Sequence, residues 1–124
     1  MSQTRYTQQH EWICLDGDSA TVGITKHAAE ALGDVVFVEV PAVGKTVAAG
    51  AEVAVVESVK AASDVYSPVG GTVAQGNADV EATPSLVNDD PEGKGWFFKL
   101  SGVNAADFDK LMDGAAYEAF LKTL

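Results

Sequence analysis

The sequence predicts a mostly β fold, a small sandwich of two related β units with short peripheral helices. Much of the chain runs in short stretches of β-branched and aromatic residues without helical spacing, as is typical of strands. Residues 43–50 (VGKTVAAG) and 69–76 (VGGTVAQG) share the pattern V-G-x-x-V-x-x-G, and a proline closely precedes each copy. Two such units joined by a hairpin would have pseudo-two-fold symmetry. The alternative is chance similarity, because valine and glycine are common in this chain.

The first expected element is a hairpin over residues 11–24. Apolar residues flank Asp16 and Gly17, a dipeptide that tolerates the positive φ angles of a tight turn. Cys14 lies in an apolar run of the first strand and is the only cysteine, so no intramolecular disulfide can form. We expect it to be a small buried side chain rather than a reactive thiol.

A short helix and a strand are expected next. Residues 25–32 are rich in alanine, Thr25 is placed to cap this helix, and Gly33 is placed to close it in the left-handed conformation. Residues 35–40 are β-branched and aromatic, which predicts a strand. Pro41 ends this strand because proline has no N–H to donate to a neighbouring strand.

A second hairpin is expected between the two repeat copies. Residues 52–58 and 63–67 are β-rich, and Lys60 lies almost midway between the copies, which places it at the hairpin tip. The small residues after Lys60 suit a tight, exposed turn. A bare, protruding lysine of this kind is open to an acylating enzyme, whereas the alternative is an ordinary solvent-exposed lysine.

The C-terminal third is expected to hold helices and one strand. Residues 83–85 (TPS) are typical of a helix cap with proline in the first helical position. Residues 88–95 are expected to form a loop, and residues 96–100 the last strand. Residues 105–121 carry a stripe at helical spacing, which predicts packing against the core rather than a cofactor site. This stripe, broken near Gly114, consists of Phe108, Leu111, Met112, Tyr117, Phe120 and Leu121.

The charge balance excludes several classes of partner. The chain has 18 Asp and Glu against 8 Lys and Arg, a formal charge of −10. This balance argues against nucleic acid and against an anionic membrane surface, since both need basic patches. His10 and His27 have no cysteine or carboxylate at metal-ligand spacing, so no metal site is expected. The first residues lack the apolar stretch of a signal peptide, so we expect a cytoplasmic protein.

Six segments carry a resemblance that reaches from Tyr6 to Tyr117. They are YTQQHEW at 6–12, VGIT at 22–25, LGD at 32–34, ESVKA at 57–61, YSPV at 66–69 and GW at 95–96. In this order and spacing they closely resemble the H-protein family of the glycine cleavage system. The resemblance implies one lipoyl-carrier domain over residues 1–124, folded as a lipoyl-domain barrel-sandwich hybrid with a C-terminal helix.

The resemblance also implies a function and a cofactor. Lipoic acid would be joined by an amide bond to Lys60, in the motif formed with Glu57, Ser58, Val59 and Ala61. The lipoyl group would accept an aminomethyl group from the P-protein, a pyridoxal-phosphate glycine decarboxylase. The T-protein, an aminomethyltransferase, would pass the one-carbon unit to tetrahydrofolate, and the L-protein, a dihydrolipoyl dehydrogenase, would reoxidise the dithiol. A lipoylating enzyme would be a fourth partner, and the chain itself would be a carrier rather than an enzyme.

Two acidic residues match family positions that line a cleft for the loaded arm. Glu11 and Asp64 would accept hydrogen bonds from its protonated amine. The alternative for both is a solvated acidic side chain. Two departures from the family pattern are Glu92, where a tyrosine commonly follows the proline, and a Gly-Gly pair at 70–71 in place of Ser-Gly.

Four rival functions can be compared with these residues. A biotin carrier has methionines beside its lysine, whereas Val59 and Ala61 flank Lys60 here. Lipoyl domains of 2-oxoacid dehydrogenases usually have Asp before the lysine and lack the His-Glu-Trp and Gly-Trp segments. A Schiff-base enzyme needs a desolvated lysine, which a hairpin tip does not offer. An H-like protein acting mainly as a lipoyl donor in lipoate assembly stays open, because its sequence would look the same.

Overall fold

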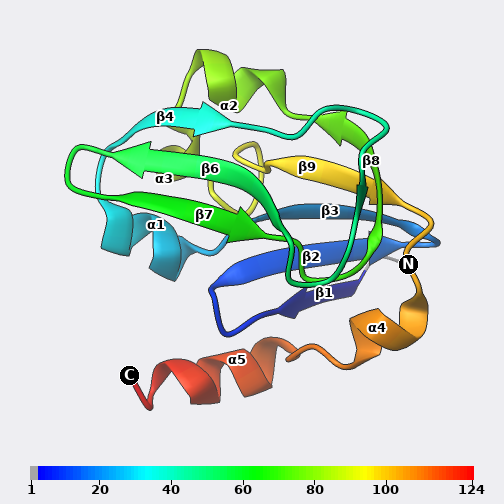
Figure 1. Cartoon of the computed structure of the whole chain (residues 1–124). Coiled ribbons are helices and arrows are strands. Elements are labelled where there is room, and N and C mark those ends of the chain that lie inside the picture. The colour runs from blue at the N-terminus through cyan, green and yellow to red at the C-terminus, as the bar shows by residue number, and fades with distance from the viewer. Residues whose placement is uncertain (1–2) are drawn as a thin grey trace.

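Two β-sheets face each other in the computed structural model, which describes residues 3–124 (Figure 1). One sheet has the strand order β1-β2-β3-β9-β8-β5 and the other the order β4-β6-β7. The strands are β1 (Gln3–Tyr6), β2 (Glu11–Asp16), β3 (Ser19–Ile24), β4 (Val35–Glu39), β5 (Thr46–Val47), β6 (Glu52–Ser58), β7 (Ala62–Tyr66), β8 (Gly71–Gly76) and β9 (Phe98–Ser101). The helices are α1 (Lys26–Leu32), α2 (Ala78–Ala82), α3 (Leu86–Asp89), α4 (Ala105–Asp109) and α5 (Gly114–Leu121). The expected mostly β class with short peripheral helices is confirmed.

The first hairpin and the first helix form where the sequence predicted them. β2 and β3 pair around a turn in which Gly17 has φ 67°. The Thr25 side chain accepts a hydrogen bond of 3.3 Å from the Ala28 N–H and so caps α1. Gly33 closes α1 with φ 80° but ψ −153°. The expected left-handed helical conformation is therefore wrong at this residue, whose angles belong to a region that is essentially open to glycine alone.

The two repeat copies lie side by side as expected for internal two-fold symmetry. β5 and β8 pair in antiparallel fashion, with Thr46 opposite Thr72. These two threonines hold equivalent places in the V-G-x-x-V-x-x-G copies, and a two-fold axis between two strands brings equivalent residues opposite one another. β6 and β7 form the hairpin between the copies.

Four elements of the structure differ from the predicted pattern. β1 and α2 were not expected, because β1 is polar and its exposed edge position leaves no alternating pattern, while α2 spans a single short turn. α3 begins at Leu86, with Ser85 as its N-cap, rather than at Pro84 as expected, since Thr83 still belongs to the end of α2. The last strand begins at Phe98, two residues later than expected.

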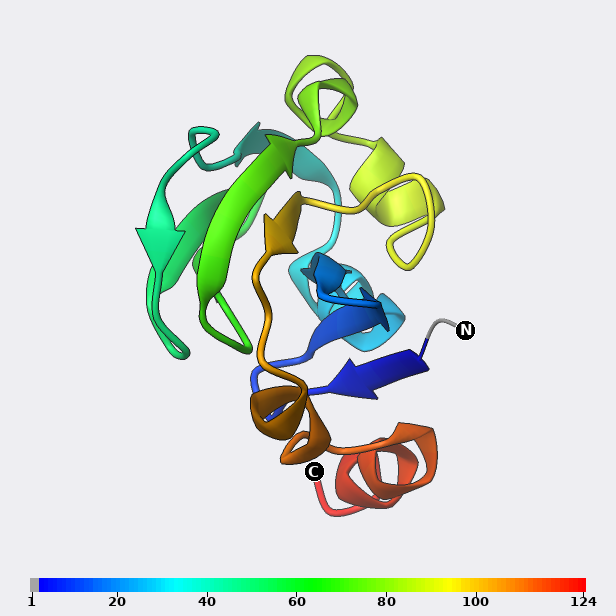
Figure 2. The same cartoon turned by 90° about the vertical axis from the view of Figure 1, so that its right-hand side faces the viewer.

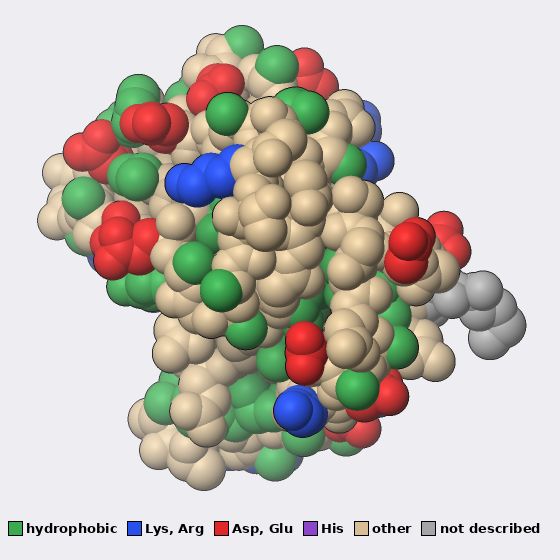
Figure 3. All heavy atoms as spheres, turned by 45° about the vertical axis from the view of Figure 1, so that its right-hand side comes forward, with side chains coloured by type: hydrophobic (Ala, Val, Ile, Leu, Met, Phe, Trp, Pro, Cys, Tyr) green, Lys and Arg blue, Asp and Glu red, His purple; other side chains and the backbone are tan. Residues whose placement is uncertain are grey.

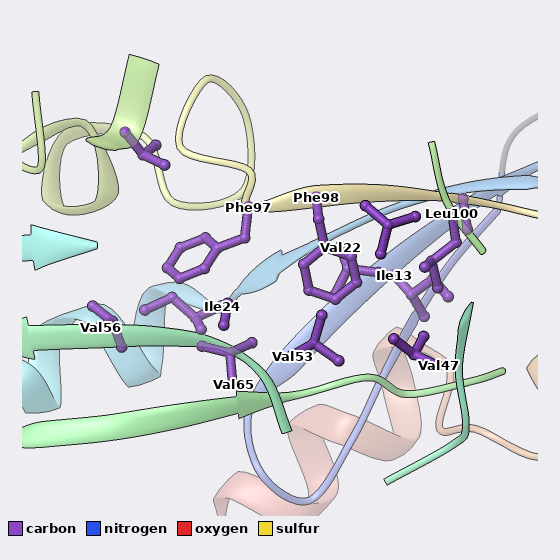
Figure 4. Close-up of a cluster of buried hydrophobic side chains, with 14 of the residues drawn as sticks. Ile13, Val22, Ile24, Val47, Val53, Val56, Val65, Phe97, Phe98 and Leu100 are labelled. Atoms are coloured by element: carbon purple, nitrogen blue, oxygen red, sulfur yellow. The ribbon is translucent and has the colours of Figure 1, made fainter. Parts of the chain in front are cut away.

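The core lies between the two sheets. Valines of β6 and β7 face the apolar side chains of β2, β3 and β9 (Figure 4). Phe97, Phe98 and Phe108 are fully buried, and these large side chains supply much of the apolar area removed from water. The predicted C-terminal stripe packs in part as expected: Phe108 and Tyr117 are buried, whereas its other members are half-buried.

The C-terminal helix α5 lies beside β1 (Figures 1 and 2), and it is hydrogen-bonded to the two residues that flank the first hairpin, His10 and Thr25. The Tyr117 hydroxyl lies 2.8 Å from the Thr25 hydroxyl and 2.8 Å from Nδ1 of His10. His10 has φ 66°, an uncommon value for a residue other than glycine, and its ring lies 4.5 Å from the ring of His27. The helix is therefore held to the first hairpin through a buried tyrosine.

The His10 environment predicts a pH dependence of stability. Burial, followed by the nearby His27, lowers the pKa of His10 from its ordinary value of 6.5. The stabilising contribution is therefore present above pH 6.5 and is lost as pH falls through the lower folded-state pKa, because the unfolded chain binds the proton more tightly. The free energy of unfolding should fall over this window in the parent. His10→Asn, which tolerates the positive φ, should remove this part of the slope.

Denaturant unfolding of both proteins at a series of pH values between about 7.5 and 5 measures this slope. Comparing the two proteins at each pH cancels the contribution of the carboxyl groups, which they share. Equal slopes in the parent and the variant would contradict the prediction.

The surface of the described residues matches the acidic composition. Acidic side chains occur in several separate places on the face shown in Figure 3, where basic side chains are few. No helix within residues 3–124 is long and apolar enough to cross a membrane.

Candidate functional site: the Lys60 hairpin and the adjacent cleft

Lys60 lies at the exposed tip of the β6–β7 hairpin, which projects from one end of the molecule (Figure 1). Ser58 shapes the tip: its hydroxyl accepts hydrogen bonds from the N–H groups of Lys60 (3.3 Å) and Ala61 (3.1 Å). The Ser58 N–H also donates to the Ala61 carbonyl at 2.7 Å. Val59 beside the lysine is 70% exposed. The lysine thus lies on a short turn that is held by hydrogen bonds among its own residues, and the residues that follow it have small side chains.

The tip rests on the segment that joins α1 to β4. The Val59 N–H donates a hydrogen bond of 3.1 Å to the carbonyl of Asp34. A Cβ atom added to Gly33 would lie 3.4 Å from Cε of Lys60, so the lysine side chain lies directly over this glycine. Asn88 of α3 also contacts this segment. Its Oδ1 accepts a hydrogen bond from the Val35 N–H at 2.9 Å, and its Nδ2 donates to the Gly33 carbonyl at 2.7 Å.

A cleft of about 220 Å³ lies beside this segment. One side is formed by α1 and the other by β6 and β7. Its floor and walls are mainly apolar, with two carboxylates among the lining residues. The lining consists of Gln9, His10, Glu11, Ile24, Ala28, Ala31, Leu32, Val56, Ser63, Asp64 and Val65.

Glu11 is one of the two cleft carboxylates, and it is only 2% exposed. Its two oxygens accept hydrogen bonds from the Thr7 hydroxyl (2.9 Å) and from the Tyr66 N–H (2.8 Å). Burial raises the pKa of the Glu11 carboxyl, and the hydrogen bonds from Tyr66 and Thr7 oppose this rise. The alternative that Glu11 is a solvated surface acid is therefore wrong. Each carboxylate oxygen keeps a free lone pair for a further donor.

Asp64 is the second cleft carboxylate, and it differs from Glu11 in being exposed. It lies on β7 opposite Val55 and next to the buried Val65. The structure therefore brings Glu11 and Asp64 to one cleft, with Glu11 inside and Asp64 at the rim.

Glu92, the departure from the family pattern, has a role of its own in the structure. Its Oε2 accepts a hydrogen bond of 3.0 Å from the Lys26 N–H, the first N–H of α1. A carboxylate is favourable at this end of a helix because the N–H groups there lack partners within the helix. The indole N–H of Trp12 donates to the Pro91 carbonyl at 2.9 Å and fixes the same loop.

Sequence reasoning found the residues of the tip and missed those beneath it. Lys60 and Ser58 of the tip and Glu11 of the cleft were predicted, whereas Asn88 and Gly33 were expected only as parts of a loop and a helix end. A lone glycine between a helix and a strand was the available signal for Gly33. Asn88 gave none, because its partners are more than 50 residues away in the sequence.

Comparisons with known proteins identify the family. A sequence model described as "Glycine cleavage H-protein" matches residues 4–124. The chain belongs to the glycine cleavage H-protein family. It is 60% identical over 124 residues to the glycine cleavage system H protein of Parvibaculum lavamentivorans, covering 100% of this chain and 99% of that protein. It is 61% identical to that of Paramagnetospirillum magneticum, with the same coverage.

A solved structure shows the same fold. The crystal structure of a glycine cleavage system H protein from Mycobacterium marinum matches with a TM-score of 0.85 and 37% identity, covering 98% of each chain. The expected H-protein fold with its C-terminal helix is thereby confirmed. Membership of the H-protein family also disfavours the biotin-carrier and Schiff-base alternatives. No cluster of three or more His, Cys, Asp or Glu side chains suited to a metal ion occurs among residues 3–124.

Proposed function

We propose that this chain is the lipoyl-carrying shuttle of the glycine cleavage system, with lipoic acid joined to Lys60. The observation that carries the proposal is the position of Lys60 at an exposed hairpin tip within a chain of the H-protein family. The lipoyl group, when bound, supplies a dithiolane that accepts the aminomethyl group of glycine and is reduced. The chain is a carrier and not a catalyst in this proposal.

The residues present fit a lipoyl group. Lys60 is exposed, and the Ser58 hydrogen bonds hold its turn open to a modifying enzyme. The adjacent cleft has an apolar lining from Ile24, Ala28 and Leu32, which suits a long hydrocarbon arm. The Glu11 carboxylate inside the cleft suits an arm that ends in a protonated amine.

The protein's own residues have three tasks in this proposal. The tip, formed by Glu57, Ser58, Val59 and Ala61 around Lys60, presents the lysine to a lipoylating enzyme. The apolar cleft walls exclude water from the arm. Glu11 and Asp64 hold the amine by accepting its hydrogen bonds, which keeps it from being lost to water.

Three enzymes would use the carrier in turn. The P-protein would load it, the T-protein would unload it, and the L-protein would restore its disulfide. The chain would act as one domain over residues 1–124. Its location in the cytoplasm stays a prediction. Action as a lipoyl donor in lipoate assembly is the second function that the sequence left open, and genes for the P- and T-proteins beside the gene of this chain would favour glycine cleavage.

Site-specific modification tests the proposal. Protein made in a host supplied with lipoate should gain the mass of one lipoyl group, and peptide mapping should place it on Lys60, since the other six lysines lack the exposed tip. Protein from a lipoate-deprived host lacking lipoate synthesis is the control. An adduct on Lys45 or Lys99 in place of Lys60 would overturn the assignment.

A further inference from the structure

Asn88 is linked to the lysine hairpin without touching it. It lies on α3, far from Lys60 in the sequence, yet its side chain makes two hydrogen bonds to the backbone at the junction of α1 and β4. Oδ1 accepts from the Val35 N–H at 2.9 Å, and Nδ2 donates to the Gly33 carbonyl at 2.7 Å. These two bonds hold both ends of a three-residue segment, so they determine its orientation as well as its position.

That segment, residues 33–35, supports the hairpin tip and is called the support below. Asp34, between the two residues that Asn88 holds, accepts the Val59 N–H at 3.1 Å. Gly33 lies under the Lys60 side chain, with its missing Cβ position 3.4 Å from Cε. Two contacts therefore connect Asn88 to the tip, one through the backbone of Asp34 and one through the surface of Gly33.

Residues 33–35 need a contact from another element to stay fixed, because this segment begins with a glycine. Gly33 has more conformational freedom than any other residue type. Its N–H still donates to the Ala29 carbonyl at 3.2 Å, but its ψ of −153° turns the chain away from the helix, and its own carbonyl is held by Asn88. Asparagine offers a donor and an acceptor on one rigid amide, which matches a carbonyl and an N–H on the same segment. Aspartate would lose the donor, and alanine would lose both bonds.

We infer that Asn88 is a positioning residue for Lys60: through Gly33 and Val35 it sets the direction in which the lysine side chain leaves the hairpin. The lysine side chain passes over Gly33, the residue that directly follows Leu32 of the cleft lining. The functional use of this fixed side-chain direction rests on the proposed lipoyl-carrier function, whereas the positioning of Lys60 by Asn88 does not. Glu92 caps the other end of α1, so the 88–92 segment holds the cleft wall at both ends.

Hydrogen exchange in the unmodified protein tests the positioning directly. Asn88→Ala should speed exchange of the Val59 N–H about tenfold, because its acceptor on Asp34 is no longer held in place. Asn88→Asp should act in the same direction, since it cannot donate to Gly33. Val87→Ala is the matched control: Val87 is fully buried on the same helix, so its loss weakens the fold without touching the support.

Modification kinetics give the second readout. With a lipoate-transferring enzyme and the whole folded protein, Asn88→Ala should lower kcat for modification of Lys60 roughly tenfold, because fewer complexes align the amine with the acyl donor. The KM should stay unchanged, since the surface around the tip is the same. Val87→Ala should keep both constants at any temperature where the protein is folded.

The outcomes separate the two proposals. If Val59 exchange in Asn88→Ala matches that in Val87→Ala at equal free energy of unfolding, Asn88 is merely structural and the inference is overturned. A rise in KM with kcat unchanged would also overturn it, because recognition rather than alignment would then be lost. If Lys60 of the parent is not modified at all, the proposed function fails, and the Val59 exchange still decides the role of Asn88.

Discussion

Lys60→Arg is expected to abolish lipoyl attachment, and glycine cleavage with it, while the fold stays intact. Arginine keeps the positive charge and the length of lysine, but its delocalised guanidinium is not acylated in place of an amine. Lys60 lies at an exposed tip, so the free energy of unfolding should change by less than about 0.5 kcal/mol. Intact mass, glycine-dependent CO2 release with the partner enzymes and thermal unfolding measure the three effects.

Lys45→Arg is the matched control for this variant. Lys45 is also an exposed lysine beside a short strand, and it belongs to the repeat rather than to the hairpin tip. That variant should be lipoylated and active like the parent. A large loss of thermal stability in Lys60→Arg would mean that the lysine packs into the fold, contrary to its position. Residual lipoylation of Lys60→Arg would show that another lysine serves as the attachment site.

The parts of the fold that could be predicted from the sequence depend on local patterns. The Asp16-Gly17 turn, the Thr25 cap and the two similar repeat copies each reflect the conformational preferences of neighbouring residues. The same holds for Lys60, because the small residues that follow it favour a tight turn. The antiparallel pairing of Thr46 with Thr72 could be anticipated only because the repeat itself implied a two-fold axis.

The parts that could not be predicted depend on partners distant in the sequence. Glu11 bonds to the Tyr66 N–H across 55 residues, so its burial is invisible from the residues around it. Asn88 is separated from Gly33 by the same number of positions. In both cases a polar side chain completes the backbone hydrogen bonding of another element. A sequence read residue by residue shows that such a side chain is polar, but not which orphaned N–H or carbonyl it meets.

Because Glu11 is buried in the cleft, we expect its substitution to have the greatest effect on how firmly the loaded arm is held. A partner amine inside the cleft would meet a carboxylate that is shielded from water, with Thr7 and Tyr66 fixing its orientation. A hydrogen bond of this charged type contributes about 1.5–3 kcal/mol. This range corresponds to a preference for the docked arm of about tenfold or more. Glutamine has the same shape and can still accept from the Tyr66 N–H, so it removes the charge with little change in packing.

Glu11→Gln should also change the response of stability to pH. Burial raises the pKa of Glu11 in the folded state. The stability associated with this raised pKa is present below the unfolded value of 4.5 and is lost as pH rises through the folded value. The parent should therefore lose stability relative to Glu11→Gln as pH rises above 4.5. Parallel pH profiles of the two proteins would show that the carboxyl is not perturbed by burial.

The isolated, aminomethyl-loaded Glu11→Gln protein should release ammonia and formaldehyde about tenfold faster than the parent, because its cleft no longer holds the protonated amine by a charged hydrogen bond. Lipoylation of Lys60 and oxidation of the dithiol by the L-protein should stay unchanged, since neither uses the amine. Asp64→Asn should have a smaller effect in the same direction, because Asp64 is exposed at the rim and water screens its charge.

Glu52→Gln is the charge-matched control. It removes an exposed carboxylate at the end of β6 far from Lys60, and the variant should release ammonia at the parent rate. Release at the parent rate in both Glu11→Gln and Asp64→Asn would refute the cleft role, and Glu11 would then serve only to join β2 to β7 through the Tyr66 N–H.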